Sequence, residues 1–246
     1  MIWVLTLEKS EEGRIELISL KNLERINQEA KKFQIDFILI GGYAVRAYTN
    51  PRSWRFTKDM DFITTRKDLG ALRGVFALLG YSFDETEFGV KGRKMFDKSS
   101  IELHISVDRV IDWSTGLEYK LPEDIFTKAS ELNVKASLEE NEGLEVNVMV
   151  APMEDIVIMK LMTERPRDHF DAIAMILDSF GKLDIPRFNE ICSRNDLYLH
   201  IKKRLDSILA DIKRSLTKKL WREFTGRELI RQQEIELRTK ITKLID

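Results

Sequence analysis

Cysteine, histidine and long apolar runs are scarce in this sequence of 246 residues. The single cysteine, Cys192, excludes an internal disulfide and a cysteine-based zinc site, and it suits a reducing cytoplasm. No apolar stretch approaches the roughly 18–20 residues that cross a bilayer, so we expect no membrane partner. The first residues lack the basic start of a signal peptide, and residues 1–18 are predicted to form two short strands.

Charged residues are abundant, at 33% of the chain, and hydrophobic residues make up 43%. This balance is typical of a folded globular protein with one large domain or two modest ones. The net charge of −1 hides an asymmetry, because residues 196–246 hold 13 Lys or Arg against 8 Asp or Glu. A basic C-terminal part permits nucleic-acid contact but is also typical of an ordinary solvated surface.

The hydrophobic pattern predicts an α/β (α+β) fold, a mixed sheet flanked by helices and followed by a helical region. We expect strands at 36–40, 55–64, 92–97, 100–107 and 144–150, and early helices at 20–33, 43–48 and 65–80. Proline-led helix starts follow at Pro152, Pro166 and Pro186. The tail is predicted to end in two antiparallel helices, the second opened by a capping box at 225–228. These patterns divide the chain into domains 1–150 and 151–246.

Paired acids lie in residues 55–62, where polar and apolar side chains alternate. Alternate residues of a strand share a face, which predicts one face carrying Arg55, Thr57, Asp59 and Asp61. Acids two positions apart stand roughly 6.6 Å apart at the backbone, so their carboxylates can converge on one or two metal ions.

A second alternating segment, residues 101–105, places Glu102 and His104 on one face. If this strand lies beside the first, Glu102 becomes a third acid. Carboxylates about 5 Å apart repel by roughly 3 kcal/mol, so such a cluster needs cations, and oxygen ligands favour Mg²⁺ or Mn²⁺. The alternative is that the acids pair with surface cations such as Arg93, and that His104 is a hydrogen-bonded structural residue.

Gly41 and Gly42 end a continuous apolar strand and lead into a short helix. Bare backbone next to a helix N-terminus can bind phosphate, although a glycine pair also makes ordinary tight turns. A strand, a glycine pair and a helix, followed by a strand with paired acids, form a much more specific arrangement.

Residues 40–42 followed by Asp59-Met60-Asp61-Phe62 resemble the signature of the DNA polymerase β-type nucleotidyltransferase superfamily. The form of residues 55–62 is most similar to its AbiEii-type toxin branch and related minimal nucleotidyltransferases. Segments 151–155 and 165–171, with Lys160 between them, strengthen this likeness, which covers about residues 36–180. The interval before Asp59 is longer than usual, and Gly42 stands where many members have serine.

The resemblance implies a magnesium- or manganese-dependent nucleotidyltransferase. In this interpretation Asp59, Asp61 and Glu102 hold the metal ions and are catalytic, while the backbone of Gly41 and Gly42 cradles the phosphates. The reaction would be in-line attack on the α-phosphate of a nucleoside triphosphate, with release of pyrophosphate.

The resemblance also implies nucleotide binding by six further residues, with the helical domain completing the nucleotide site: Arg55, Thr57, Lys160, Arg167, Asp168 and Asp171. The alternative for Lys160 is a lysine that snorkels at the edge of an apolar helix face. For Arg167, Asp168 and Asp171 the alternative is a network that braces helices, in which Arg167 pairs with Asp171 at i, i+4. Trp54, Trp113 and Trp221 are interpreted as packing residues.

The resemblance leaves the acceptor open: an RNA 3′ end such as that of a tRNA, a protein hydroxyl, or a small molecule. It admits a toxin role with an antitoxin partner. The rival hypothesis, from another class, is a non-catalytic nucleotide- or partner-binding module that keeps the fold. Asp59 and Asp61 argue against this rival, because a decayed site usually loses its acids first.

Overall fold

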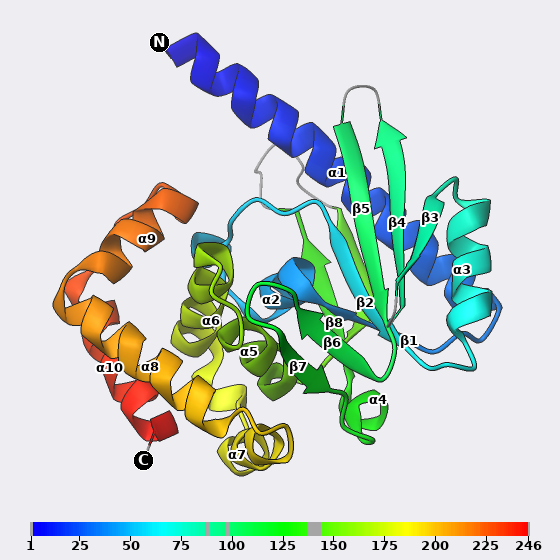
Figure 1. The fold of residues 1–246 in the computed structure, drawn as a ribbon. Coiled ribbons are helices and arrows are strands. Elements are labelled where there is room, and N and C mark those ends of the chain that lie inside the picture. Colours follow the sequence, from blue (N-terminus) through cyan, green and yellow to red (C-terminus); the bar gives the residue numbers. More distant parts are fainter. Residues whose placement is uncertain (1, 87–88, 97–98, 137–143, 246) are drawn as a thin grey trace. The chain divides into compact units, whose positions relative to one another are not determined.

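The computed structural model describes residues 2–86, 89–96, 99–136 and 144–245, with only the backbone for residues 2–10. It confirms the expected mixed α/β fold followed by a helical region (Figure 1). The chain forms two compact units. The first comprises residues 1–47, 56–109 and 123–151, and the second comprises residues 48–55, 110–122 and 152–246. The domain boundary near residue 150 stays a prediction.

Helix α1 spans Ile2–Lys32, so the prediction of two strands in residues 1–18 is wrong. Gly13, where the two expected strands would have turned, lies inside the helix, and a glycine there costs only about 1 kcal/mol. Packing offsets this cost, because the apolar stripe of the helix is fully buried; it consists of Leu20, Leu23, Ile26 and Ala30. Helix α1 packs against strand β9 and helix α3.

A seven-stranded sheet forms the centre of the first unit, in the order β3-β4-β5-β2-β1-β9-β8 (Figure 1). Its strands are β1 (Phe37–Ile40), β2 (Met60–Thr64), β3 (Ser82–Thr86), β4 (Gly89–Phe96), β5 (Ser99–Ser106), β8 (Ser130–Lys135) and β9 (Glu145–Val150). Strand β2 runs antiparallel to β1 and parallel to β5, while β5 runs antiparallel to β4. Helix α4 (Ile125–Lys128) precedes β8.

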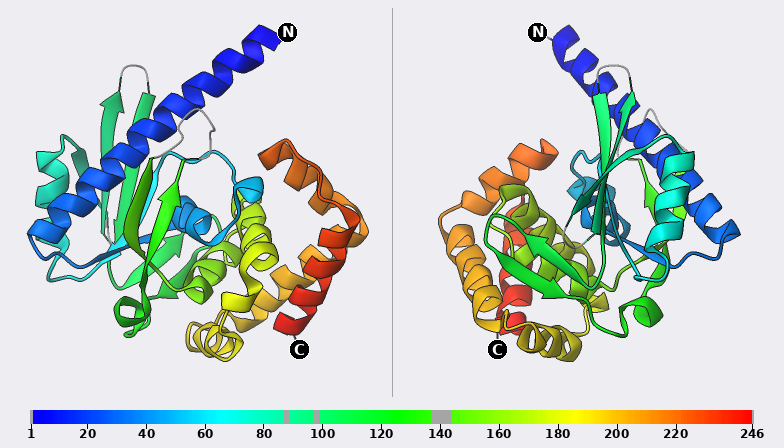
Figure 2. Two further views of the ribbon diagram at one scale, coloured as in Figure 1. Left: turned by 180° about the vertical axis from the view of Figure 1, so that it is seen from behind. Right: turned by 45° about the vertical axis from the view of Figure 1, so that its right-hand side comes forward.

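The two faces of strand β2 have different surroundings. Phe62 is fully buried and its ring lies 5.7 Å from that of Phe76 in helix α3 (Leu69–Leu78). Helices α1 and α3 lie side by side on this part of the sheet (Figure 2). Asp61, the residue before Phe62, points to the opposite face.

The second unit contains the two-stranded sheet β6 (Arg109–Asp112) and β7 (Leu117–Lys120). Its helices are α5 (Met153–Leu161), α6 (Pro166–Ser179), α7 (Ile185–Arg194), α8 (Tyr198–Lys213), α9 (Leu216–Thr225) and α10 (Arg231–Ile245). Helix α6 packs against α5, α9 and α10, as Figure 2 shows. No helix in the described ranges is long and apolar enough to cross a membrane.

The tail forms three helices, where the sequence predicted two. Ser215 adopts a left-handed conformation (φ 58°) and separates α8 from α9. Gly226 is also left-handed and ends α9, while the Thr225 hydroxyl donates to the carbonyl of Trp221. The predicted capping box at 225–228 is therefore a helix end, and α10 begins at Arg231.

The packing interpretation holds for Trp221, which is buried, but is wrong for Trp113, whose residue is 78% exposed. Trp113 lies in the turn between β6 and β7. The carboxylate of Asp112 accepts hydrogen bonds from the Ser114 hydroxyl at 2.6 Å and from the Thr115 backbone and hydroxyl. These bonds organise the turn without using the indole.

Candidate active site

The predicted acid pair lies at the start of strand β2. Asp61 stands opposite Ile40 of β1 and opposite His104 of β5. Asp59 comes one residue before the strand, and its Oδ1 accepts the backbone N–H of Glu102 at 3.0 Å. The observed strand β2 covers only the second half of the strand expected over 55–64, so Arg55 and Thr57 lie before it.

Gly41 and Asp61 are in direct contact. Gly41 begins helix α2 (Gly41–Tyr48) with φ +71°, a conformation that side chains rarely adopt. A Cβ placed on Gly41 would lie 2.0 Å from Oδ2 of Asp61. The pairing of Ile40 with Asp61 explains this approach, because the chain leaves β1 directly beside the carboxylate. The structure thus brings the glycine bend and Asp61 together.

Glu102 faces cations. Its Oε1 lies 2.6 Å from Arg93 Nη2, and its Oε2 lies 3.1 Å from Lys91 Nζ, both from strand β4. Burial alone would raise the pKa of Glu102, but the hydrogen bonds from Arg93 and Lys91 outweigh it and lower the pKa. The surface pairing that the sequence left open is therefore present for Glu102.

His104 is hydrogen-bonded, as the alternative interpretation of the sequence expected. Its Nδ1 lies 3.0 Å from Oδ1 of Asp61. This hydrogen bond raises the pKa of His104 against the opposing effect of burial. Positive charge on the imidazole would therefore stabilise the Asp61 carboxylate.

The donor chemistry at Asp59 and Asp61 fits a hard divalent cation. A carboxylate offers about four lone-pair sites, so a hydrogen bond to one oxygen leaves others available to a cation. All four oxygens belong to carboxylates, which suits Mg²⁺ or Mn²⁺ better than Zn²⁺. Within the described ranges, however, no three Asp, Glu, His or Cys side chains are gathered for one metal ion. Glu102 is held apart by its own partners.

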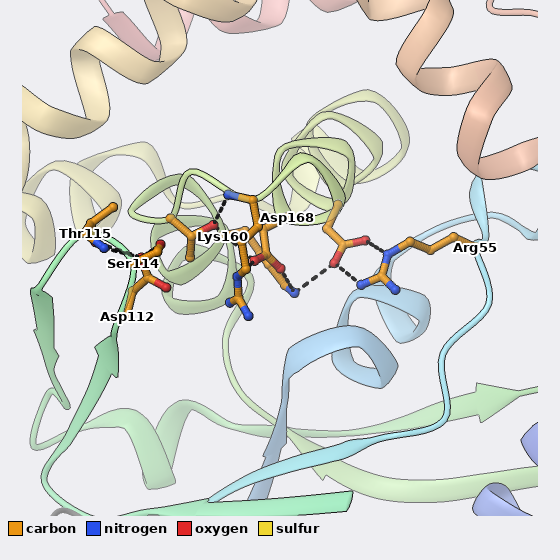
Figure 3. A network of polar contacts seen from close by, with 9 residues as sticks. Arg55, Asp112, Ser114, Thr115, Lys160 and Asp168 are labelled. Carbon is orange, nitrogen blue, oxygen red and sulfur yellow. Dashed lines mark hydrogen bonds and ion pairs between the residues drawn. The ribbon is translucent and has the colours of Figure 1, made fainter. Parts of the chain in front are cut away.

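A buried charge network occupies the second unit (Figure 3). The Nζ of Lys160, in α5, lies 2.6 Å from Asp168 Oδ1 and 2.8 Å from Asp171 Oδ2, both in α6. The other oxygen of Asp168 accepts from Arg165 and Thr163. Burial would lower the pKa of Lys160, but the two carboxylates raise it; conversely, Lys160 lowers the pKa of Asp168 against burial.

Arg55 belongs to this network. Its Nε and Nη2 donate to the two oxygens of Asp171 at 2.8 and 2.7 Å, which is the bidentate geometry of a strong ion pair. The predicted pair between Arg167 and Asp171 is wrong, because Arg167 is exposed and Asp171 binds Arg55 and Lys160. Half-buried Thr57 lies two residues after Arg55.

Sequence reasoning missed Lys91, and it treated Arg93 only as a surface partner. The signal was present, because Lys91 and Arg93 alternate on β4 just as Glu102 and His104 alternate on β5. The predicted strand began at residue 92, which left Lys91 outside it. With the observed bounds, Lys91 stands opposite His104 and Arg93 stands opposite Glu102 in the pairing of β4 with β5.

This mixed sheet, with a glycine bend against a paired-acid strand, is a nucleotidyltransferase-type fold. A family model described as nucleotidyl transferase AbiEii toxin, type IV toxin–antitoxin system, matches residues 26–241. The chain therefore belongs to the AbiEii nucleotidyltransferase toxin family. No match was found among curated proteins.

Among the solved structures that the chain resembles, MenT4 has the same fold at low sequence identity. MenT4, a nucleotidyltransferase toxin from Mycobacterium tuberculosis H37Rv, is 13% identical with a TM-score of 0.51, and the alignment covers 96% of this chain and 85% of MenT4. ANT(2″)-Ia, solved with adenylyl-2″-tobramycin, is 15% identical with a TM-score of 0.49, covering 72% and 96%.

Proposed function

We propose that this protein is a divalent-metal-dependent enzyme that transfers a nucleoside monophosphate from a nucleoside triphosphate to an acceptor hydroxyl. The observation that carries the proposal is the contact between the Asp61 carboxylate and the side-chain-free bend at Gly41, with Asp59 two residues before Asp61. Family membership supports the nucleotide-transfer class. The metal, the nucleotide and the acceptor are the proposed elements.

The protein's own groups have separable tasks in this reaction. The backbone N–H groups at Gly41 and Gly42 open helix α2 and would bind the triphosphate tail. Asp59 and Asp61 would hold Mg²⁺ or Mn²⁺, with Glu102 as a third acid. Bound ions of this kind neutralise phosphate charge and favour the ionised form of an attacking hydroxyl. His104 keeps Asp61 oriented through its hydrogen bond.

In the proposed transfer one bond to phosphorus forms and one breaks. An acceptor oxygen forms a bond to the α-phosphorus, the bond from that phosphorus to the β-phosphate oxygen breaks, and pyrophosphate leaves. The hydroxyl proton passes to a carboxylate or to water. The acceptor that we favour is an RNA 3′ end, with a protein hydroxyl and a small molecule as the other outcomes of the test. An antitoxin partner, and nucleotide binding by Arg55, Thr57, Lys160, Arg167, Asp168 and Asp171, stay predictions.

The direct test is incubation of the full chain with each of four α-labelled triphosphates, Mg²⁺ and total cellular RNA. We expect labelled RNA and released pyrophosphate. Label in protein would identify the second acceptor class. The double variant Asp59→Asn/Asp61→Asn should lose labelling by more than 100-fold, because both proposed metal carboxylates are removed. Asp206→Asn, an exposed aspartate of α8, is the matched control and should label normally.

Persistent labelling in the double variant would contradict the assignment of the site. Calorimetric titration separates the enzyme from a non-catalytic module. Binding of a triphosphate with Mg²⁺, without pyrophosphate release across RNA, protein and small-molecule acceptors, would favour the binding module.

A further inference from the structure

Two rows of side chains cross strands β2, β5 and β4 on the sheet face that carries Asp61. In the first row, Asp59 contacts the backbone of Glu102, and Glu102 pairs with Arg93. In the second row, Asp61 contacts His104, and His104 stands opposite Lys91. The proposed metal acids are therefore bordered, two strands away, by two cations.

The two cations hold the side chain of Glu102. Arg93 binds one oxygen of its carboxylate through both Nε and Nη2, and Lys91 binds the other. The backbone of Glu102 is already tied to Asp59, so only its side chain has to rotate to approach the acid pair. In the described ranges three metal-ligating side chains are not gathered, which agrees with this sequestration.

The two cations are accessible to an outside anion. The side chain of Arg93 is 54% exposed and that of Lys91 is 38% exposed, whereas that of Glu102 is 24% exposed. A phosphodiester competes well with a carboxylate for Arg and Lys, because guanidinium binds phosphate in the same bidentate manner. An ion pair at this exposure is weak enough to exchange.

We propose that Lys91 and Arg93 bind phosphates of a nucleic-acid acceptor and thereby release Glu102 to join Asp59 and Asp61 at the divalent-metal site. This inference rests on the proposed function. It couples acceptor binding to completion of the metal site, so that the third acid becomes available only when an acceptor is bound. A polycationic small-molecule acceptor would be repelled by the same two side chains.

The first test measures Mn²⁺ affinity by calorimetry on the full chain, with and without a single-stranded RNA oligonucleotide. RNA should tighten Mn²⁺ binding at least about fivefold in the wild-type protein, and Mn²⁺ should tighten RNA binding by the same factor. Glu102→Gln should abolish this coupling while RNA still binds. Because the same RNA is used, direct Mn²⁺ binding by the RNA cancels between the two proteins.

The second test uses Lys91→Gln/Arg93→Gln. Without RNA this variant should bind Mn²⁺ more tightly than the wild type, and adding Glu102→Gln should remove most of the gain. The slope of log affinity for RNA against log salt should become shallower by about 1.4, because two phosphate contacts are lost. Arg73→Gln removes an exposed cation paired with Glu85 in the same unit and should change neither quantity.

Two results would overturn the proposal. An unchanged salt slope together with unchanged Mn²⁺ coupling in the double variant would overturn the proposal. Loss of triphosphate binding with normal RNA binding would also overturn it, since the cations would then serve the triphosphate. Thermal unfolding by circular dichroism identifies variants that fail to fold. If the Lys91→Gln/Arg93→Gln protein fails to fold, the coupling between RNA and Mn²⁺ binding in Glu102→Gln tests the proposal. If Asp59→Asn/Asp61→Asn retains Mn²⁺ binding and transfer, the assignment of the metal site is wrong. If the wild-type protein transfers no label to RNA, protein or small molecules, the proposed function itself fails.

Discussion

At the scale of single residues, the close approach of Asp61 restricts which residue can stand at position 41. Gly41 has a left-handed backbone, and a Cβ placed on it would lie only 2.0 Å from Oδ2 of Asp61, so any side chain is disfavoured for two independent reasons. The left-handed conformation alone costs a side-chain-bearing residue about 1–2 kcal/mol. The contact with Asp61 adds the free energy of displacing its carboxylate.

We expect Gly41→Ala to lower the free energy of unfolding by at least about 1–2 kcal/mol and to weaken Mn²⁺ binding, because Asp61 must move. Urea denaturation and calorimetry measure the two effects. Gly74→Ala is the matched control: it lies in helix α3 with open space around its Cβ position. That change should stabilise the protein by roughly 0.5–1 kcal/mol. Equal effects of both changes would contradict the proposed steric conflict.

Loss of Lys160 should destabilise the second unit strongly, because this lysine neutralises two carboxylates that are 2% exposed. Lys160→Met should lower the free energy of unfolding by about 3–5 kcal/mol, since Asp168 and Asp171 keep fewer partners. Denaturant unfolding measures this loss of unfolding free energy. Arg66→Ala breaks the surface pair with Asp108 and should cost no more than about 1 kcal/mol.

The pH dependence of stability follows from Asp168. Its folded pKa is lowered, so its charged form stabilises the fold above the ordinary aspartate pKa of about 3.9. That contribution is lost as pH falls through the folded pKa. Unfolding free energies measured from pH 6 to pH 3 should therefore fall more steeply below about pH 4 in the wild type than in Asp168→Asn. Parallel curves would refute this role.

At the scale of elements, helix α1 is attached to the first unit by polar contacts as well as by its apolar stripe. Glu16 forms a 2.6 Å ion pair with Arg46 of helix α2, and both side chains are at most 2% exposed. The hydroxyl of Ser19 donates to the carbonyl of Lys58, close to the segment that carries Asp59. Asn27 donates to the carbonyl of Asn147 in β9.

Removing the acid of this buried pair should therefore destabilise the unit strongly. Glu16→Ala leaves the Arg46 charge buried with fewer partners and should cost about 3–5 kcal/mol in unfolding free energy. Lys31, also on helix α1, forms an exposed ion pair with Glu131 of β8. Lys31→Ala removes this pair and should cost less than about 1 kcal/mol in unfolding free energy. Chemical denaturation of both variants checks the difference, and similar losses would argue against the buried pair.

At the scale of the whole molecule, ligand binding should appear as a rise in unfolding temperature. A ligand at 100 times its dissociation constant stabilises the folded state by about 2.7 kcal/mol. We expect Mg²⁺ together with the preferred triphosphate to raise the melting temperature of the wild type, measured by scanning calorimetry. Asp59→Asn/Asp61→Asn should show no such rise, and a chelator should reverse it in the wild type. A chelator-resistant rise would contradict metal dependence.

Short-range pattern predicted much of this molecule. Strand β1, the glycine bend and Asp61 on β2 follow from local alternation and turn chemistry, which need no knowledge of distant contacts. The partners of the charged groups did not follow: Glu102 meets Arg93 only because β4 pairs with β5, and Asp171 meets Arg55 across more than a hundred residues. Helix α1 was misjudged because its first apolar residues suit either a strand or a helix.

The turn at Trp113 has a practical consequence. Trp221 is buried and the Trp54 indole N–H donates to the carbonyl of Thr49, whereas the Trp113 indole stands in water. A collisional quencher such as acrylamide should therefore reach Trp113 well before Trp221. The protein thus carries an intrinsic fluorophore at the tip of one hairpin, able to report an arriving macromolecule without a chemical label.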